Sequence, residues 1–93
     1  MVSKKLKKAR SRIDKVDNSI FILIKKRTRI VKHMMELKKN KNEIVDSKRM
    51  KEILKKVKKK SLKHKIDPQI TNRIWKSIIW SYVDYQRKNF RKK

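Results

Sequence analysis

A chain of 93 residues is long enough for one domain with a modest core, and 37% apolar residues leave little surplus for a larger one. The absence of Cys excludes disulfides, thiolate metal sites and a Cys nucleophile, and the absence of Gly, with a single Pro, removes the usual residues of tight turns and hairpins. A formal charge of +24, from 32 Lys and Arg against 8 Asp and Glu, makes a polyanion one partner to consider. We predict an all-α fold, with residues 1–93 forming a single domain.

The positive charge is spread along the whole chain and is mostly Lys. Such a field steers small anions and attracts nucleic acid non-specifically. The aromatic residues gather towards the C-terminus without a basic recognition face beside them, so a nucleic-acid-binding protein is a remote alternative. The longest segment without Lys or Arg, 16–24, has nine residues. No membrane span or signal peptide is therefore expected, and the expected location is the cytoplasm.

The first expected helix covers about residues 3–39, because nothing in the sequence breaks a helix before Asn40. An apolar stripe at steps of three and four runs along it. The stripe is formed by Ile13, Val16, Ile20, Leu23, Ile24, Val31 and Met34. Arg10, Arg27 and Lys38 share this face, so charged residues lie where core residues are expected.

This expected helix is longer than a compact domain of 93 residues is wide. It would span roughly 55 Å, whereas a compact domain of this size has a radius of gyration of about 13 Å. Its N-terminal half would expose the apolar stripe unless another chain covered it, so we predict a homodimer with interlocked long helices. Asp14 and Asp17 lie on this half in basic surroundings. We interpret them as a charge-balancing pair rather than as a general acid and base.

A second helix is expected over about 47–64, with Asp46 or Ser47 as its N-cap. Its narrow apolar stripe is formed by Met50, Ile53, Leu54, Val57 and Leu62. The Lys residues between positions 55 and 60 are interpreted as a solvated face.

The third helix is expected from Pro68, with Asp67 as its N-cap, to about Arg91. Its predicted inner face is formed by Ile70, Ile74, Trp75, Ile78, Tyr82 and Gln86, with Ile79 and Phe90 at the margin.

Distances along the first helix separate its three stripe cations. Arg27 and Lys38 are about 16 Å apart along the axis, so their long side chains can bracket one small anion. Arg10 lies about 25 Å before Arg27 and cannot reach the same ligand from the same chain. If Arg10 contributes to that site, it comes from the partner helix of an antiparallel dimer. The alternative is that Arg10 and Arg27 reach solvent at the edge of the stripe.

Three further polar residues are weaker candidates. Gln86 ends the inner face of the third helix, where it is either a ligand or an ordinary surface amide. Arg49 lies in the first turn of the second helix, where the helix dipole disfavours a cation, and this mild conflict favours a function. Asp46 can serve as a cap and as a ligand. No catalytic triad, metal cluster or Gly-rich phosphate loop can be assembled, so neither a metal nor a cofactor is expected.

Several segments carry a resemblance to a known family. They are Ala9-Arg10-Ser11-Arg12-Ile13-Asp14-Lys15-Val16-Asp17, Ile24-Lys25-Lys26-Arg27, Lys38, Ile44-Val45-Asp46-Ser47-Lys48-Arg49, and Ile74-Trp75-Lys76-Ser77-Ile78-Ile79 through Gln86. Their order and spacing resemble the all-helical chorismate mutase family over about residues 6–90. The resemblance implies a dimer of three-helix chains, in which each active site is enclosed largely by one chain and receives one Arg from the other.

The resemblance also implies a site for chorismate, a small dicarboxylate. Its carboxylates would pair with Arg27 and with Arg10 from the partner, because the guanidinium fork binds carboxylate bidentately. Lys38 and Gln86 would hold the ether oxygen of the breaking bond, and Arg49 would add positive charge at the mouth. The reaction would be a Claisen rearrangement to prephenate in aromatic amino acid biosynthesis. It needs no cofactor, and catalysis would rest on conformer selection and preorganised charge.

Two positions depart from the family pattern. Family mutases usually carry Glu after the Arg that matches Arg49, where it receives the substrate hydroxyl, but this chain has Met50. Tyr82 stands where a small hydroxyl residue is common. Both changes are similar to those of the isochorismate-pyruvate lyase branch, which releases pyruvate from isochorismate and leaves salicylate. The retained Asp46 and the segment 74–79 are typical of mutases, so we favour the mutase and count Asp46, Met50 and Tyr82 among the substrate-binding positions.

Overall fold

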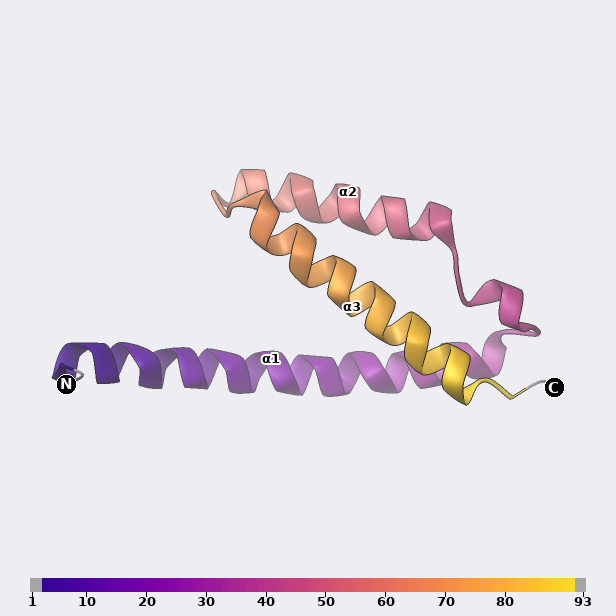
Figure 1. The fold of residues 1–93 in the computed structure, drawn as a ribbon, viewed down its shortest axis with the longest axis horizontal. Coiled ribbons are helices and arrows are strands. Elements are labelled where there is room, and N and C mark those ends of the chain that lie inside the picture. Colours follow the sequence, from indigo (N-terminus) through magenta and orange to yellow (C-terminus); the bar gives the residue numbers. More distant parts are fainter. Residues whose placement is uncertain (1–2, 92–93) are drawn as a thin grey trace. The chain divides into compact units, whose positions relative to one another are not determined.

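The computed structural model of the chain describes residues 3–91, which form three α-helices and one short 3-10 helix (Figure 1). The elements are α1 at Lys4–Leu37, η1 at Lys41–Glu43, α2 at Ser47–Lys63 and α3 at Pro68–Asn89. No strand occurs among the described residues, and the predicted all-α class is confirmed. Each helix end lies within two residues of its predicted position.

Side-chain caps organise the connection between α1 and α2. The Asn40 side chain accepts a hydrogen bond from the backbone N–H of Asn42 at 3.1 Å, and the Glu43 carboxylate accepts one from the backbone N–H of Asn40 at 3.1 Å. This reciprocal capping box closes η1. Asp46 then accepts from the backbone N–H of Arg49 at 3.0 Å, as expected of the predicted N-cap of α2.

A tight turn joins α2 to α3. The backbone N–H of Ile66 donates to the Ser61 carbonyl at 2.8 Å, and that of Lys65 donates to the Leu62 carbonyl at 3.3 Å. This is the bonding pattern of a Schellman motif, which satisfies the last carbonyls of a helix. Lys65 has a φ of 57°, in the left-handed region that favours glycine. Because the chain has no glycine, a lysine takes this position at an energetic cost.

The chain divides into two compact units, which are described separately, and the boundary follows His33. In the first unit, α1 exposes the apolar residues Ile13, Val16, Ile20, Phe21, Ile22 and Leu23, with exposed fractions between 48% and 67%. Ile13, Val16, Ile20 and Leu23 belong to the predicted stripe, so the predicted exposure of its N-terminal part in a single chain is confirmed. The assignment of residues 1–93 to one domain stays a prediction.

In the second unit, α2 packs against α3, and the two helices meet at the turn (Figure 1). Its buried apolar residues are Ile44, Ile79 and Val83, and its buried polar residues are Ser61 and Gln86.

The predicted inner face of α3 is partly wrong. Ile70 is 55% exposed and Ile74 is 47% exposed, whereas Ile79, which was placed at the margin, is buried. The cause is a polar contact that the apolar pattern does not reveal. The hydroxyls of Ser61 and Thr71 lie 2.6 Å apart in a hydrogen bond, so the Thr71 side of α3 faces α2. This turns the inner face by one residue towards Ile79.

The strained turn yields a stability prediction. We expect Lys65→Gly to raise the free energy of unfolding by about 1 kcal/mol, because glycine adopts a positive φ without a Cβ clash. Urea denaturation followed by circular dichroism measures the change. Lys63→Gly is the matched control, because the same substitution inside the last turn of α2 should lower stability by up to about 1 kcal/mol. Destabilisation by both variants would contradict this account of the turn.

Candidate functional site

A polar contact between distant parts of the second unit joins Lys38 to Gln86. Lys38 follows α1 directly, and its backbone N–H still bonds to the Met34 carbonyl at 3.2 Å. The Lys38 Nζ donates to Gln86 Oε1 at 2.6 Å, across 48 positions of sequence. Gln86 Nε2 donates in turn to the carbonyl of Tyr82, one turn earlier on α3, at 3.1 Å. The Gln86 amide is therefore held at both of its polar atoms.

Burial makes this pair chemically useful. Gln86 is only 7% exposed, and Lys38 is half-buried. A Lys ammonium carries three N–H donors and a Gln amide carries two, and the two hydrogen bonds use one donor from each side chain. The remaining donors suit a ligand oxygen, because a partly desolvated ammonium makes stronger hydrogen bonds than one in water. The arrangement can stabilise negative charge that develops on an oxygen atom.

The segment after Lys38 is fixed by backbone hydrogen bonds. The backbone N–H groups of Asn40 and Lys39 donate to the Glu43 carboxylate and hold its pKa below the usual range. The capping box therefore works best with Glu43 ionised. It fixes the chain immediately after the lysine that bonds to Gln86.

The start of α2 holds three of the predicted site positions. Asp46 uses its side chain as the N-cap, so its capping role is confirmed and its ligand role stays a prediction. The Arg49 side chain is 57% exposed, and its guanidinium lies 3.7 Å from the carboxylate of Glu52. An ion pair this exposed leaves the arginine accessible to a ligand. Met50 is half-buried and brings no strong hydrogen-bonding group to this region.

Arg10 and Arg27 lie on α1 in the first unit. Arg10 is exposed, and Arg27 is half-buried. The helix between them is continuous, so the separation of about 25 Å along the axis holds. One small ligand cannot span these two guanidinium groups of the same chain. The prediction that Arg10 serves the site of a second chain therefore keeps its geometric basis.

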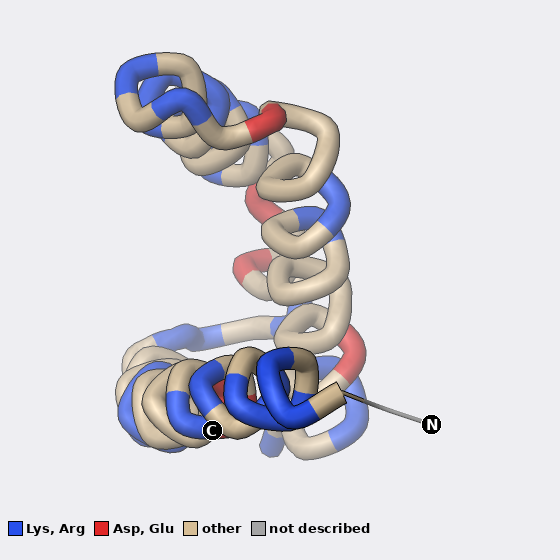
Figure 2. The backbone as a smooth tube through the Cα atoms, turned by 90° about the vertical axis from the view of Figure 1, so that its left-hand side faces the viewer, with Lys and Arg blue, Asp and Glu red and all other residues tan. Residues whose placement is uncertain are grey.

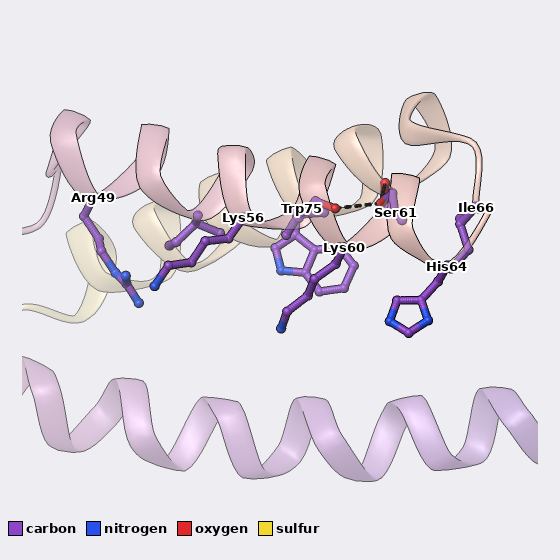
Figure 3. Close-up of a pocket in the computed structure, with 10 residues that line it drawn as sticks. Arg49, Lys56, Lys60, Ser61, His64, Ile66 and Trp75 are labelled. Atoms are coloured by element: carbon purple, nitrogen blue, oxygen red, sulfur yellow. Dashed lines mark hydrogen bonds between the residues drawn. The ribbon is translucent and has the colours of Figure 1, made fainter.

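Within the second unit, a groove of about 330 Å³ lies between α2 and α3 (Figure 3). Arg, Lys and His side chains of α2 and of its C-cap residue form one row along it. This basic row consists of Arg49, Lys56, Lys60 and His64. Trp75 of α3 also lines the groove, beside the hydrogen-bonded hydroxyls of Ser61 and Thr71.

The sequence does not reveal this basic row, because its pattern predicts that Lys56 and Lys60 belong to a solvated face. Both residues are exposed, as that interpretation requires, but they line the groove. Their spacing was the available signal. Steps of seven and four from Arg49 place both of them on the face that also carries Ile53 and Val57.

Several kinds of site find no support in residues 3–91. No group of three or more His, Asp and Glu side chains in this part of the chain is arranged to hold a metal ion. None of its helices combines the length and the apolar character that a membrane crossing needs. Lys and Arg occur on all three helices, and Asp and Glu positions are few (Figure 2).

The sequence matches the chorismate mutase type II family over residues 9–87. The match covers most of the chain, so the chain belongs to this family, and the expected family is confirmed. No curated protein and no solved structure matches the chain. Membership supports chorismate mutase activity, which is an isomerisation, and it does not separate the mutases from the isochorismate-pyruvate lyase branch. All the predicted site positions, from Arg10 to Gln86, fall inside the matched range.

The Lys38–Gln86 hydrogen bond yields a prediction for a double-mutant cycle. Lys38→Met and Gln86→Leu should each lower the free energy of unfolding, and the double variant should lose less than the sum. The expected coupling is on the order of 1.5 kcal/mol, because the bond is charge-assisted and partly buried. Chemical denaturation of the four proteins measures it.

Lys39→Met and Gln69→Leu provide the control cycle for this measurement. Both residues are exposed, Lys39 in the connection after α1 and Gln69 on α3 of the same unit, so their coupling should be near zero. If Lys38 and Gln86 proved as additive as this control pair, the hydrogen bond would not contribute to stability.

Proposed function

We propose that the chain converts chorismate to prephenate at a site in which Lys38 and Gln86 bind the ether oxygen. The observation that carries this assignment is their hydrogen bond of 2.6 Å. The family resemblance implies that both residues bind the same substrate atom, the ether oxygen. Two side chains that bind one atom must have their polar groups close together. Family membership supports the activity, and the observed contact supports these two residues as its centre.

The rearrangement breaks one C–O bond and forms one C–C bond inside a single molecule. No proton, electron or group enters or leaves, so the site needs neither a nucleophile nor a general base. Negative charge develops on the ether oxygen as its bond to carbon breaks. The ammonium of Lys38 and an amide N–H of Gln86 would stabilise that charge, and Gln86 is already oriented by its bond to the Tyr82 carbonyl.

Arginine side chains are suited to bind the two carboxylates of the substrate. We propose that Arg27 binds one of them and that Arg10 of a second copy binds the other, holding the extended substrate in its reactive, folded conformer. Arg49 would attract the dianion at the entrance, and the net charge of +24 would speed its arrival. Asp46, Met50 and Tyr82 would line the site. Met50 offers no acceptor for the ring hydroxyl, so binding would rest on the carboxylates and the ether oxygen.

A homodimer is part of this proposal. The exposed apolar stripe in the first unit needs a cover, and the length of α1 separates Arg10 from Arg27 in one chain. A second copy with the same stripe meets both needs. We also propose that the dimer works in the cytoplasm and that it binds nucleic acid only non-specifically, through its net charge.

The activity is tested with purified protein and chorismate. Wild-type protein should remove the chorismate absorbance and should give no salicylate fluorescence with isochorismate. Arg27→Ala and Lys38→Ala should each lower kcat/KM by a factor of about 100 to 1,000, as expected when one preorganised donor is lost. Arg29→Ala, on the same helix, is the control and should keep normal activity. Near-normal activity in either site variant would show that the site is wrongly assigned.

The contribution of Arg10 from a second copy is tested by mixing two inactive variants. Arg10→Ala and Lys38→Ala chains should each be almost inactive alone. In a mixed dimer, one of the two sites would receive an intact Arg10 and keep its own Lys38. After exchange at equal concentrations, about a quarter of wild-type activity should return, because half of the dimers are mixed and each has one intact site. Failure to recover activity in mixed dimers would contradict the proposal.

A further inference from the structure

Lys38 lies at the point where α1 ends and an exposed connection begins. Its backbone N–H is still bonded to the last turn of the helix, to the carbonyls of Met34 and Met35 at 3.2 and 3.3 Å. Residues 39–43 follow and are exposed, and the chain has no glycine that could close the helix in a left-handed conformation. The helix therefore fixes Lys38 on one side only, and the position of its ammonium also depends on what holds the connection.

The side chain of Glu43 holds this connection from its far end. One carboxylate oxygen, Oε2, accepts hydrogen bonds from the backbone N–H of Lys39 and, at 3.1 Å, from that of Asn40. The Asn40 side chain completes the capping box. The next residue, Ile44, is only 5% exposed. The carboxylate therefore ties the backbone directly after Lys38 to a residue that is anchored in the core of the second unit.

The same connection lies beside the end of α3 that carries Gln86. Residues 40–42 line a hollow together with Phe90, which is the C-cap residue of α3. Phe90 follows Gln86 by four positions, or about one helical turn. The capping box is thus close to both partners of the Lys38–Gln86 hydrogen bond, and a change in the box can move one partner relative to the other.

Charge strengthens the hold of Glu43 on the backbone. The N–H groups of Asn40 and Lys39 lower the pKa of the Glu43 carboxyl, and the nearby ammonium groups of Lys39 and Lys38 lower it further. An ionised carboxylate accepts stronger hydrogen bonds than a neutral oxygen does. Glu43 can therefore act on Lys38 in two ways, through its bonds to the backbone or through its charge, and a neutral acceptor at position 43 distinguishes them.

We propose that Glu43 is a positioning residue for Lys38, whose backbone bonds place the ammonium against Gln86 and against the ether oxygen of a bound substrate. The catalytic consequence rests on the proposed function, whereas the effect on the Lys38–Gln86 contact does not. In this role Glu43 does not itself contact the substrate. Without its carboxylate, water would bond to the two exposed N–H groups, so the fold would persist while the ammonium would occupy a wider range of positions.

Three variants of the full chain test the catalytic part. Glu43→Ala removes the acceptor, Glu43→Gln keeps a neutral acceptor of the same shape, and Asp84→Ala removes an exposed carboxylate from α3 as the control for charge. Glu43→Ala should lower kcat for chorismate about tenfold and change KM less than about twofold, because Lys38 acts on charge that develops in the transition state. Glu43→Gln should stay within about threefold of the wild type, and Asp84→Ala should match it.

Two results of these assays would overturn the positioning role. If Glu43→Ala lowered the urea midpoint of unfolding and left kcat unchanged, the residue would serve stability alone. If Glu43→Gln were as slow as Glu43→Ala, the charge of Glu43 would matter rather than its hydrogen bonds. Asn40→Ala opens the same box from its other side, and it should also lower kcat with little change in KM.

A second measurement needs no substrate. The double-mutant cycle of Lys38→Met and Gln86→Leu is repeated in the Glu43→Ala and Asp84→Ala backgrounds, with chemical denaturation as before. The coupling between Lys38 and Gln86 should fall by at least about half in the first background and stay unchanged in the second. Unchanged coupling in the Glu43→Ala background would contradict the positioning role.

The two measurements separate this proposal from the proposed function. A chain that converts chorismate, and whose kcat and coupling are the same with and without Glu43, contradicts the positioning role alone. A chain that loses the coupling in Glu43→Ala but does not act on chorismate contradicts the proposed function alone. A wild-type chain without coupling between Lys38 and Gln86 contradicts the positioning role, whatever its activity.

Discussion

The hydrogen bond from Lys38 to Gln86 is the interaction on which the candidate site depends. It joins Lys38, the residue directly after the long helix, to the buried amide near the end of α3. The capping box at Asn40 fixes the chain on one side of this bond, and the Tyr82 carbonyl orients the amide on the other. Because both donors are positioned before a ligand arrives, little reorganisation would accompany the development of charge on a bound oxygen.

The second constraint is the length of α1. A continuous helix of 34 residues keeps Arg10 far from Arg27 and leaves apolar residues exposed in the first unit. The proposed homodimer would account for both facts, because a second copy would cover the stripe and contribute its Arg10.

The sequence predicts the helices and the polar landmarks better than it predicts the packing. Helical spacing, in steps of three and four residues, predicts that Lys38 and Gln86 lie on inward faces. Asp46 and Asp67, as N-cap residues, indicate where α2 and α3 begin. The inward placement of Ile70 and Ile74 on α3 is wrong because the Ser61–Thr71 bond, between two polar residues, sets the rotation of the helix. The groove cations are missed because a lysine-rich helix looks solvated on every side, and only a packed neighbour shows which lysines line a groove.

The central claim is that Lys38 and Gln86 stabilise the transition state of a rearrangement inside one substrate molecule. Product analysis by NMR, with chorismate as substrate and with wild-type and Gln86→Leu proteins, tests this claim most directly. The account predicts prephenate as the sole product of the wild type and a rate at least about a hundredfold lower for the variant. Chorismate that is consumed no faster than in buffer, or equally fast by both proteins, would contradict it.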